Sequence, residues 1–99
     1  MCNYENKKGL IKMYKFSDNV AWVQEDDEYL LANYNTGKVC IISGTGIDIL
    51  NCILEEMNLE QIITTLKNKY NDTDDLSMEK DIENFIFDLI RKEYLKNEG

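Results

Sequence analysis

The run Val39-Cys40-Ile41-Ile42 marks the change from strands to helices in this chain of 99 residues. It follows the turn signal Asn35-Thr36-Gly37 and precedes Gly44-Thr45-Gly46. Four apolar residues between turn signals predict a short buried strand. β-forming residues prevail before this run, and apolar residues recur at helical spacing after it. We therefore expect a sheet up to this point of the chain and helices beyond it.

Two further strands are predicted upstream of this run. Val20 to Gln24 carries β-forming residues and an aromatic, and Tyr29 to Asn33 follows the four acids at 25–28, which read as a solvated hairpin loop. Asn35-Thr36-Gly37 fits a second tight turn, since Asn and Gly tolerate positive φ. Three consecutive strands joined by tight turns predict an antiparallel meander, in which Val39 to Ile42 is an edge strand.

The first two helices are predicted from periodicity and capping residues. Apolar residues at 47–57 recur at helical spacing, with Ser43 or Thr45 as the N-cap. Asn58 followed by Gln61 has the capping-box arrangement, which predicts a second helix to about residue 70. The tight connection between the two helices predicts a helix-turn-helix-like corner.

The third helix is expected from about Met78 to Tyr94, with Ser77 as its cap. One apolar stripe on this helix suits a core, and a second stripe, turned by roughly 100°, is not needed for one. The members of the second stripe are Phe87, Ile90 and Tyr94. We expect Phe87 either to widen the core or to help line a groove for another apolar segment.

The two ends of the chain are less clearly patterned. Residues 1–9 are polar and predict a frayed end, and Asn97-Glu98-Gly99 predicts another. Leu10 to Phe16 fits either an extra edge strand or an ordered arm. We therefore divide the chain into an N-terminal arm, residues 1–19, and a single domain, residues 20–96.

The net charge of −8 comes from 19 acidic and 11 basic residues. Such a charge repels nucleic-acid phosphates and anionic membrane surfaces, and it suits a cationic partner such as a Lys-rich peptide. Cys2, Cys40 and Cys52 have no metal-ligand spacing and predict ordinary thiols in a reducing cytosol. No apolar run approaches the roughly 20 residues that span a bilayer. We expect a cytoplasmic protein without membrane or nucleic-acid contacts.

The sequence lacks the common catalytic motifs. It contains no His and no Cys-x-x-Cys, phosphate-loop or Gly-x-Ser-x-Gly motif. We expect no catalytic residue, metal or cofactor. Two functions that need no catalytic residue stay open. One is a homodimer paired through the edge strand, and the other is a winged-helix DNA-binding regulator. The second helix has Lys67 and Lys69 for DNA but also Glu60, in an acidic domain.

An ordered set of short segments carries a family resemblance. These segments are Tyr29-Leu30-Leu31, Asn33 to Gly37, Val39 to Ser43, Thr45-Gly46-Ile47, Leu59-Glu60-Gln61-Ile62, and Asp81-Ile82-Glu83 with Phe85-Ile86 and Leu89-Ile90. Together they resemble the PqqD-like peptide chaperones, also called RiPP recognition elements, from about Val20 to Leu95. The chain departs from the family pattern at Ser43, usually Asn, at Phe87, commonly polar, and near Glu93 or Tyr94, where a Gly is common.

The resemblance implies an α+β fold of winged helix-turn-helix layout, with a three-stranded antiparallel sheet followed by three helices. It implies a non-catalytic domain that captures the leader of a ribosomally synthesised precursor peptide. The leader would add as a strand to the sheet edge and lie beside the third helix. The implied partners are the leader and a modifying enzyme such as a radical SAM enzyme, a leader peptidase or a cyclase. A lasso peptide, a thioether-bridged peptide and a quinone cofactor are the candidate products.

The strand-addition hypothesis gives a set of candidate site residues. The candidate peptide-binding residues are Val39, Cys40, Ile41, Ile42, Phe85, Phe87, Leu89 and Ile90. Some of these must belong to the core, because only one face of each element can meet the leader. Acidic residues of the third helix, which are Asp81, Glu83 and Asp88, are expected to steer a Lys-rich leader toward the site.

Overall fold

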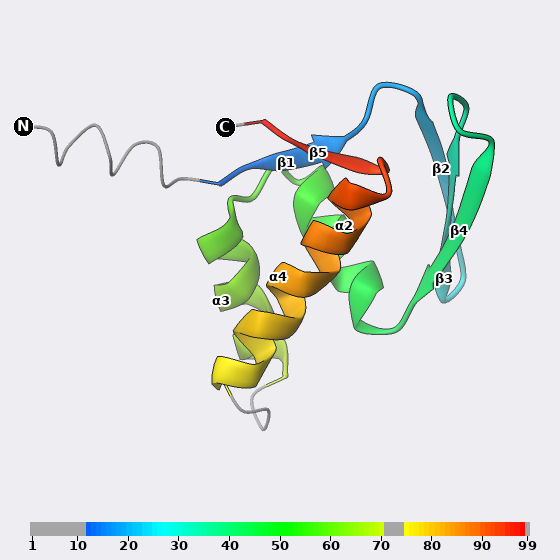
Figure 1. The fold of residues 1–99 in the computed structure, drawn as a ribbon. Helices are drawn as coiled ribbons and strands as arrows, with labels where there is room; N and C mark the ends of the chain where they lie inside the picture. The colour runs from blue at the N-terminus through cyan, green and yellow to red at the C-terminus, as the bar shows by residue number, and fades with distance from the viewer. Residues whose placement is uncertain (1–11, 71–74, 99) are drawn as a thin grey trace, which may run out of the picture.

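The computed structural model describes residues 12–70 and 75–98 (Figure 1). Its elements in chain order are β1 (Tyr14–Phe16), β2 (Val20–Glu25), β3 (Glu28–Asn33), β4 (Lys38–Ser43), α2 (Thr45–Leu54), α3 (Leu59–Lys69), α4 (Asp75–Arg91) and β5 (Leu95–Asn97). Strands β2, β3 and β4 form one sheet, and the helices lie on one side of it (Figure 1). The predicted α+β fold, a three-stranded antiparallel sheet followed by three helices, is confirmed. Its winged helix-turn-helix character stays an interpretation.

The three-stranded sheet has the order β2-β3-β4, with both neighbouring pairs antiparallel. Leu30 lies opposite Ile41, and Leu31 lies opposite Cys40. β4 is therefore an edge strand, as predicted. Since side chains alternate between the two faces of a sheet, Leu31 points toward the helices and is fully buried, whereas Leu30 on the other face is exposed.

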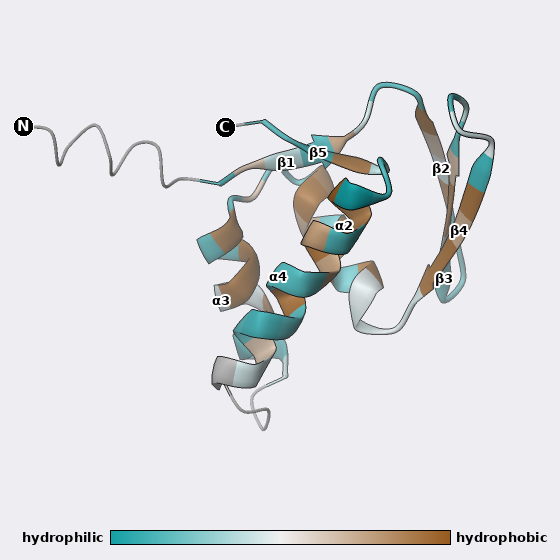
Figure 2. Cartoon of the chain, viewed as in Figure 1, coloured by the Kyte–Doolittle hydropathy of each residue, from teal (hydrophilic) through white to brown (hydrophobic). Residues whose placement is uncertain are grey.

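The core lies between the sheet and the helices. Its fully buried large side chains come from the sheet, from every helix and from β5: Tyr29, Leu31, Leu50, Ile62, Leu66, Ile82, Ile86 and Leu95. Figure 2 shows hydrophobic and hydrophilic residues alternating along α4, and its fully buried residues, Ile82 and Ile86, are hydrophobic. The apolar stripe predicted for the third helix therefore faces the core.

The turn after β3 is held by the buried side chain of Asn33. Its Oδ1 accepts hydrogen bonds from the backbone N–H groups of Asn35, at 2.8 Å, and Thr36, at 3.1 Å. Its Nδ2 donates to the backbone carbonyl of Glu93, at 2.7 Å, which ties this turn to the end of α4. Gly37 has φ 75°, so the predicted tight turn with a left-handed glycine is confirmed.

The predicted N-cap residue is found at the start of one of the three helices. The capping box of Asn58 and Gln61 is present at the start of α3. The predicted cap of the first helix by Ser43 or Thr45 is wrong, because the N-cap is Gly44, which has no side chain to accept a bond. Ser77 lies inside α4, which begins at Asp75, so it is not the N-cap either.

The C-terminal part of the chain differs from the prediction. α4 ends at Arg91, where Glu93 takes the left-handed conformation with φ 70°, close to the place where the family commonly has Gly. The chain then turns back, and β5 pairs with β1, with Asn97 opposite Tyr14. The predicted fraying of Asn97 and Glu98 is wrong, because the N–H of Glu98 also donates to the carbonyl of Met13.

The segment Leu10 to Phe16, whose structure the sequence left open, contains β1 within its described part. Tyr14 is buried in the core beside the helices, although it precedes the predicted start of the domain. Leu10 and Ile11 lie outside the described residues. The division into an arm, residues 1–19, and a domain, residues 20–96, stays a prediction.

Substituting Asn33 with Ala should destabilise the domain by about 2 kcal/mol, because it removes one donor and one acceptor that serve three backbone groups. Urea unfolding followed by circular dichroism measures the loss. Asn35→Ala is the matched control, since this exposed side chain should change stability by no more than about 0.5 kcal/mol. Equal stability of the two variants would contradict the role of Asn33.

Candidate functional site

The predicted edge strand β4 divides its side chains between two faces. Val39 and Ile41 are each 61% exposed and point away from the helices. Cys40 is half-buried and Ile42 is buried, and both point toward the helices. Of the four predicted residues on β4, Ile42 therefore belongs to the core.

The free edge of β4 also has a defined backbone pattern. In an antiparallel pair, successive residues direct their N–H and C=O groups alternately to one side and the other. The two-residue turn between Glu25 and Glu28 makes these two a hydrogen-bonded pair, so alternate β3 residues beginning with Tyr29 bond to β4. Their β4 partners include Cys40. We infer that the N–H groups of Val39 and Ile41 point out of the sheet edge.

One side of α4 faces this strand. Burial raises the pKa of the Cys40 thiol, and the nearby charges of Lys92 and Asp88 respectively lower and raise it. Lys92, which follows α4, lies close to Cys40, since the two line one pocket. A pocket of about 320 Å³ lies here, and it is lined by Lys38, Val39, Cys40, Lys92 and Tyr94.

A second pocket, of about 290 Å³, lies where β4 gives way to α2. Phe85 and Asp81 of α4 line it together with Gly46. A Cβ atom on Gly46 would lie 2.9 Å from the ring of Phe85, so the glycine allows α4 to approach closely. Phe85 and Asp88 share one side of α4 by helical spacing, and Lys92, just beyond the end of α4, forms a salt bridge with Asp88. We call the strand edge, these residues and the two pockets the β4–α4 surface.

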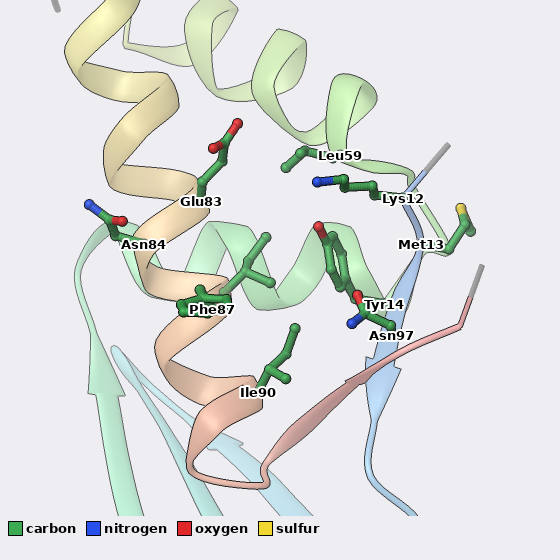
Figure 3. A pocket seen from close by; sticks show the side chains of 10 residues that line it. Lys12, Met13, Tyr14, Leu59, Glu83, Asn84, Phe87, Ile90 and Asn97 are labelled. Carbon is green, nitrogen blue, oxygen red and sulfur yellow. The ribbon is translucent and has the colours of Figure 1, made fainter. Parts of the chain in front are cut away.

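Phe87 and Ile90 lie on another side of α4. Phe87 is turned by about 200° from Phe85, since each helical residue adds about 100°. Phe87 and Ile90 line a separate pocket of about 490 Å³ between α4, β1 and the start of α3. Tyr14 and Leu59 lie across this pocket from them (Figure 3). Phe87 is 62% exposed, so it does not widen the core. The fourth predicted helix residue, Leu89, is buried in the core.

The three predicted steering acids are also separated. Asp88 forms salt bridges with Arg91, at 2.7 Å, and Lys92, at 3.1 Å, and hydrogen bonds from Lys92 and Arg91 lower its pKa. Its charge is thus largely balanced locally. Glu83 points into the pocket of Figure 3. Asp81 is the one of the three that lines a pocket of the β4–α4 surface.

Three residues that line the pocket of about 320 Å³ were not among those predicted from the sequence. Lys38 and Lys92 flank Cys40, and the buried Tyr94 closes the pocket. Tyr94 was assigned to the second apolar stripe, and Lys38 directly follows the turn glycine, but neither position by itself indicates a binding residue. Their proximity depends on the turn at Glu93, which brings Tyr94 back toward the sheet.

The thiol of Cys40 lies on the β4–α4 surface. The raised pKa of Cys40 keeps its thiol protonated near neutral pH. Among residues 12–70 and 75–98, no group of three or more Cys, Asp or Glu side chains is placed to hold a metal ion. No helix in this described part is both long and apolar enough to cross a membrane.

The solved structure of TbiB1 in complex with the TbiA(beta) leader peptide resembles this chain with a TM-score of 0.78 and 29% sequence identity. The match covers 83% of this chain and 94% of that one. Among curated proteins, none matches this chain.

A model of a known sequence family also matches this chain. Residues 28–95 match the family described as coenzyme PQQ synthesis protein D, PqqD. The matched region begins at β3 and ends at the first residue of β5, so it contains β4 and α4. This chain therefore belongs to the PqqD family.

Proposed function

We propose that this protein is a non-catalytic domain that binds the leader of a ribosomally synthesised precursor peptide by strand addition to β4. It then delivers the precursor to a modifying enzyme, such as a radical SAM enzyme or cyclase, or to a leader peptidase. The observation that carries the proposal is the open edge of β4, with the amides of Val39 and Ile41 directed outward beside two pockets. Family membership and the leader-bound structural neighbour support it.

The leader would gain affinity from its backbone and specificity from its side chains. A strand added to β4 places alternate side chains toward α4. An apolar side chain fits beside Phe85 and Cys40, both of which are half-buried and packed against the core. Phe87 and Ile90 lie on another side of α4, so the proposed contact uses Phe85 instead of these two.

The charges near the two pockets differ. The pocket at the start of β4 has Lys38 and Lys92, whereas the one at its end has Asp81. A Lys-rich leader segment would therefore be attracted to the end of β4 that lies beside Asp81. Electrostatic attraction of this kind acts mainly on the association rate and weakens with salt.

DNA binding through α3 is less well supported by the contacts of that helix. Lys67 forms a salt bridge with Glu79 at 2.9 Å, and Lys69 forms one with Asp48 at 2.8 Å. Both cations are already paired within the domain, so they are poorly placed to neutralise phosphates.

The free thiols of Cys40 and Cys52 fit the proposed location in a reducing cytosol.

Replacing Ile41 with Pro should weaken leader binding roughly tenfold or more, because it removes an amide at the free edge. The domain should stay folded, since this amide does not pair with β3. A fluorescence anisotropy titration with the labelled leader encoded beside this chain measures the affinity. Ile41→Ala is the control: it keeps the amide and should bind normally. Normal binding by Ile41→Pro, with a native circular dichroism spectrum, would refute strand addition.

Neutralising Asp81 with Asn should lower the association rate of a Lys-rich leader about two- to threefold at low salt. The effect should fade at high ionic strength, and the dissociation rate should change little. Stopped-flow fluorescence at several salt concentrations measures both rates. Glu60→Gln, an equal charge change on exposed α3, is the control. If both variants slowed association equally, net charge alone would explain the effect and Asp81 would have no local role.

A further inference from the structure

The face of the sheet that points away from the helices is unusually apolar. Antiparallel sheets with one covered face normally present polar side chains on the other. Here the register places Val23, Leu30 and Ile41 in one row across the three strands, and Ala21, Ala32 and Val39 in the next. We call these six residues the outer face. An exposed apolar patch of this kind marks an interaction site.

The exposure of its large side chains shows that nothing within the described chain covers the outer face. Val23 is 49% exposed, Leu30 is 44% exposed, and Val39 and Ile41 are each 61% exposed. Figure 2 shows brown, hydrophobic segments on β2, β3 and β4, while the helices lie on the other side of the sheet. The outer face therefore has no intramolecular partner among residues 12–70 and 75–98.

One end of the outer face is strongly acidic. Glu25 and Glu28 lie opposite each other in the row next to Val23 and Leu30, and Asp26 and Asp27 form the turn beyond them. None of the salt bridges found in the described residues involves these four acids. A protein that covers the apolar rows would therefore be favoured by basic side chains at this end.

We propose that the outer face docks the leader-processing enzyme, through an apolar surface of that enzyme bordered by Lys or Arg side chains. The inference rests on the proposed function, because β4 is shared: Val39 and Ile41 belong to the outer face, and their backbone amides form the leader edge. An enzyme seated on the outer face would thus lie directly beside the bound leader.

The charge of the chain favours this partner over a second copy of itself. Two copies would each bring a net charge of −8 and the same acidic turn to the contact. Like charges of this size oppose association and keep a domain monomeric. An enzyme with a basic border meets no such penalty.

The test uses Val23→Glu and Leu30→Glu, which change the outer face without touching the leader edge on β4. Gln24→Glu is the matched control, since it adds the same charge to the same strand on its other side. The probes are the labelled leader and the purified processing enzyme, both encoded beside this chain. Anisotropy reports leader affinity, biolayer interferometry reports enzyme affinity, and sedimentation velocity reports oligomeric state.

The wild type and Gln24→Glu should bind both probes as monomers. The two outer-face variants should bind the leader within about twofold of wild type but lose roughly tenfold or more in affinity for the enzyme. Unchanged enzyme binding by both variants would overturn the inference, as would a wild-type protein that ignores the enzyme. A wild-type dimer that Val23→Glu dissociates would assign the face to a second copy. Failure of the wild type to bind the leader would instead contradict the proposed function.

Discussion

The close approach of Gly46 to Ile42 and Phe85 is the contact on which the arrangement of the site depends. A Cβ atom at this position would lie 2.6 Å from Cγ2 of Ile42 and 2.9 Å from the ring of Phe85. Only glycine therefore lets β4, α2 and α4 meet here without displacement. Because Ile42 belongs to the core and Phe85 faces the strand, this contact sets the distance between β4 and α4. The pocket of about 290 Å³ lies at this contact, since both Gly46 and Phe85 line it.

In the proposed function and docking, β4 serves the core, a leader and an enzyme at once, because its groups point in three directions. Cys40 and Ile42 point toward the helices, and Val39 and Ile41 point to the outer face. Both the side-chain direction and the backbone hydrogen bonds of a strand repeat every two residues. The residues whose side chains point outward are thus the same ones whose amides point out of the edge. A leader in the plane of the sheet and an enzyme above it meet the same residues without competing.

Features set by neighbouring residues could be predicted from the sequence, and features set by distant contacts could not. The three strands, the turn at Gly37 and the capping box at Asn58 depend on local patterns and were confirmed. The pairing of β1 with β5 joins opposite ends of the chain, and no local pattern indicates it. Likewise, the periodicity of α4 separates Phe85 from Phe87, but only packing shows which of them lies toward β4.

The acids of this chain illustrate the same limit, since their number does not tell which of them act on a partner. Asp88 is balanced by Arg91 and Lys92, three and four residues further along α4. Burial alone would raise the pKa of Asp48, but hydrogen bonds from Lys69 and Tyr70 outweigh it and lower the pKa. Among residues 12–70 and 75–98, Asp81 and the four acids at 25–28 take part in none of the salt bridges found. These two groups of acids lie on different surfaces, so the proposed cationic leader and the proposed enzyme with a basic border would be drawn to separate places.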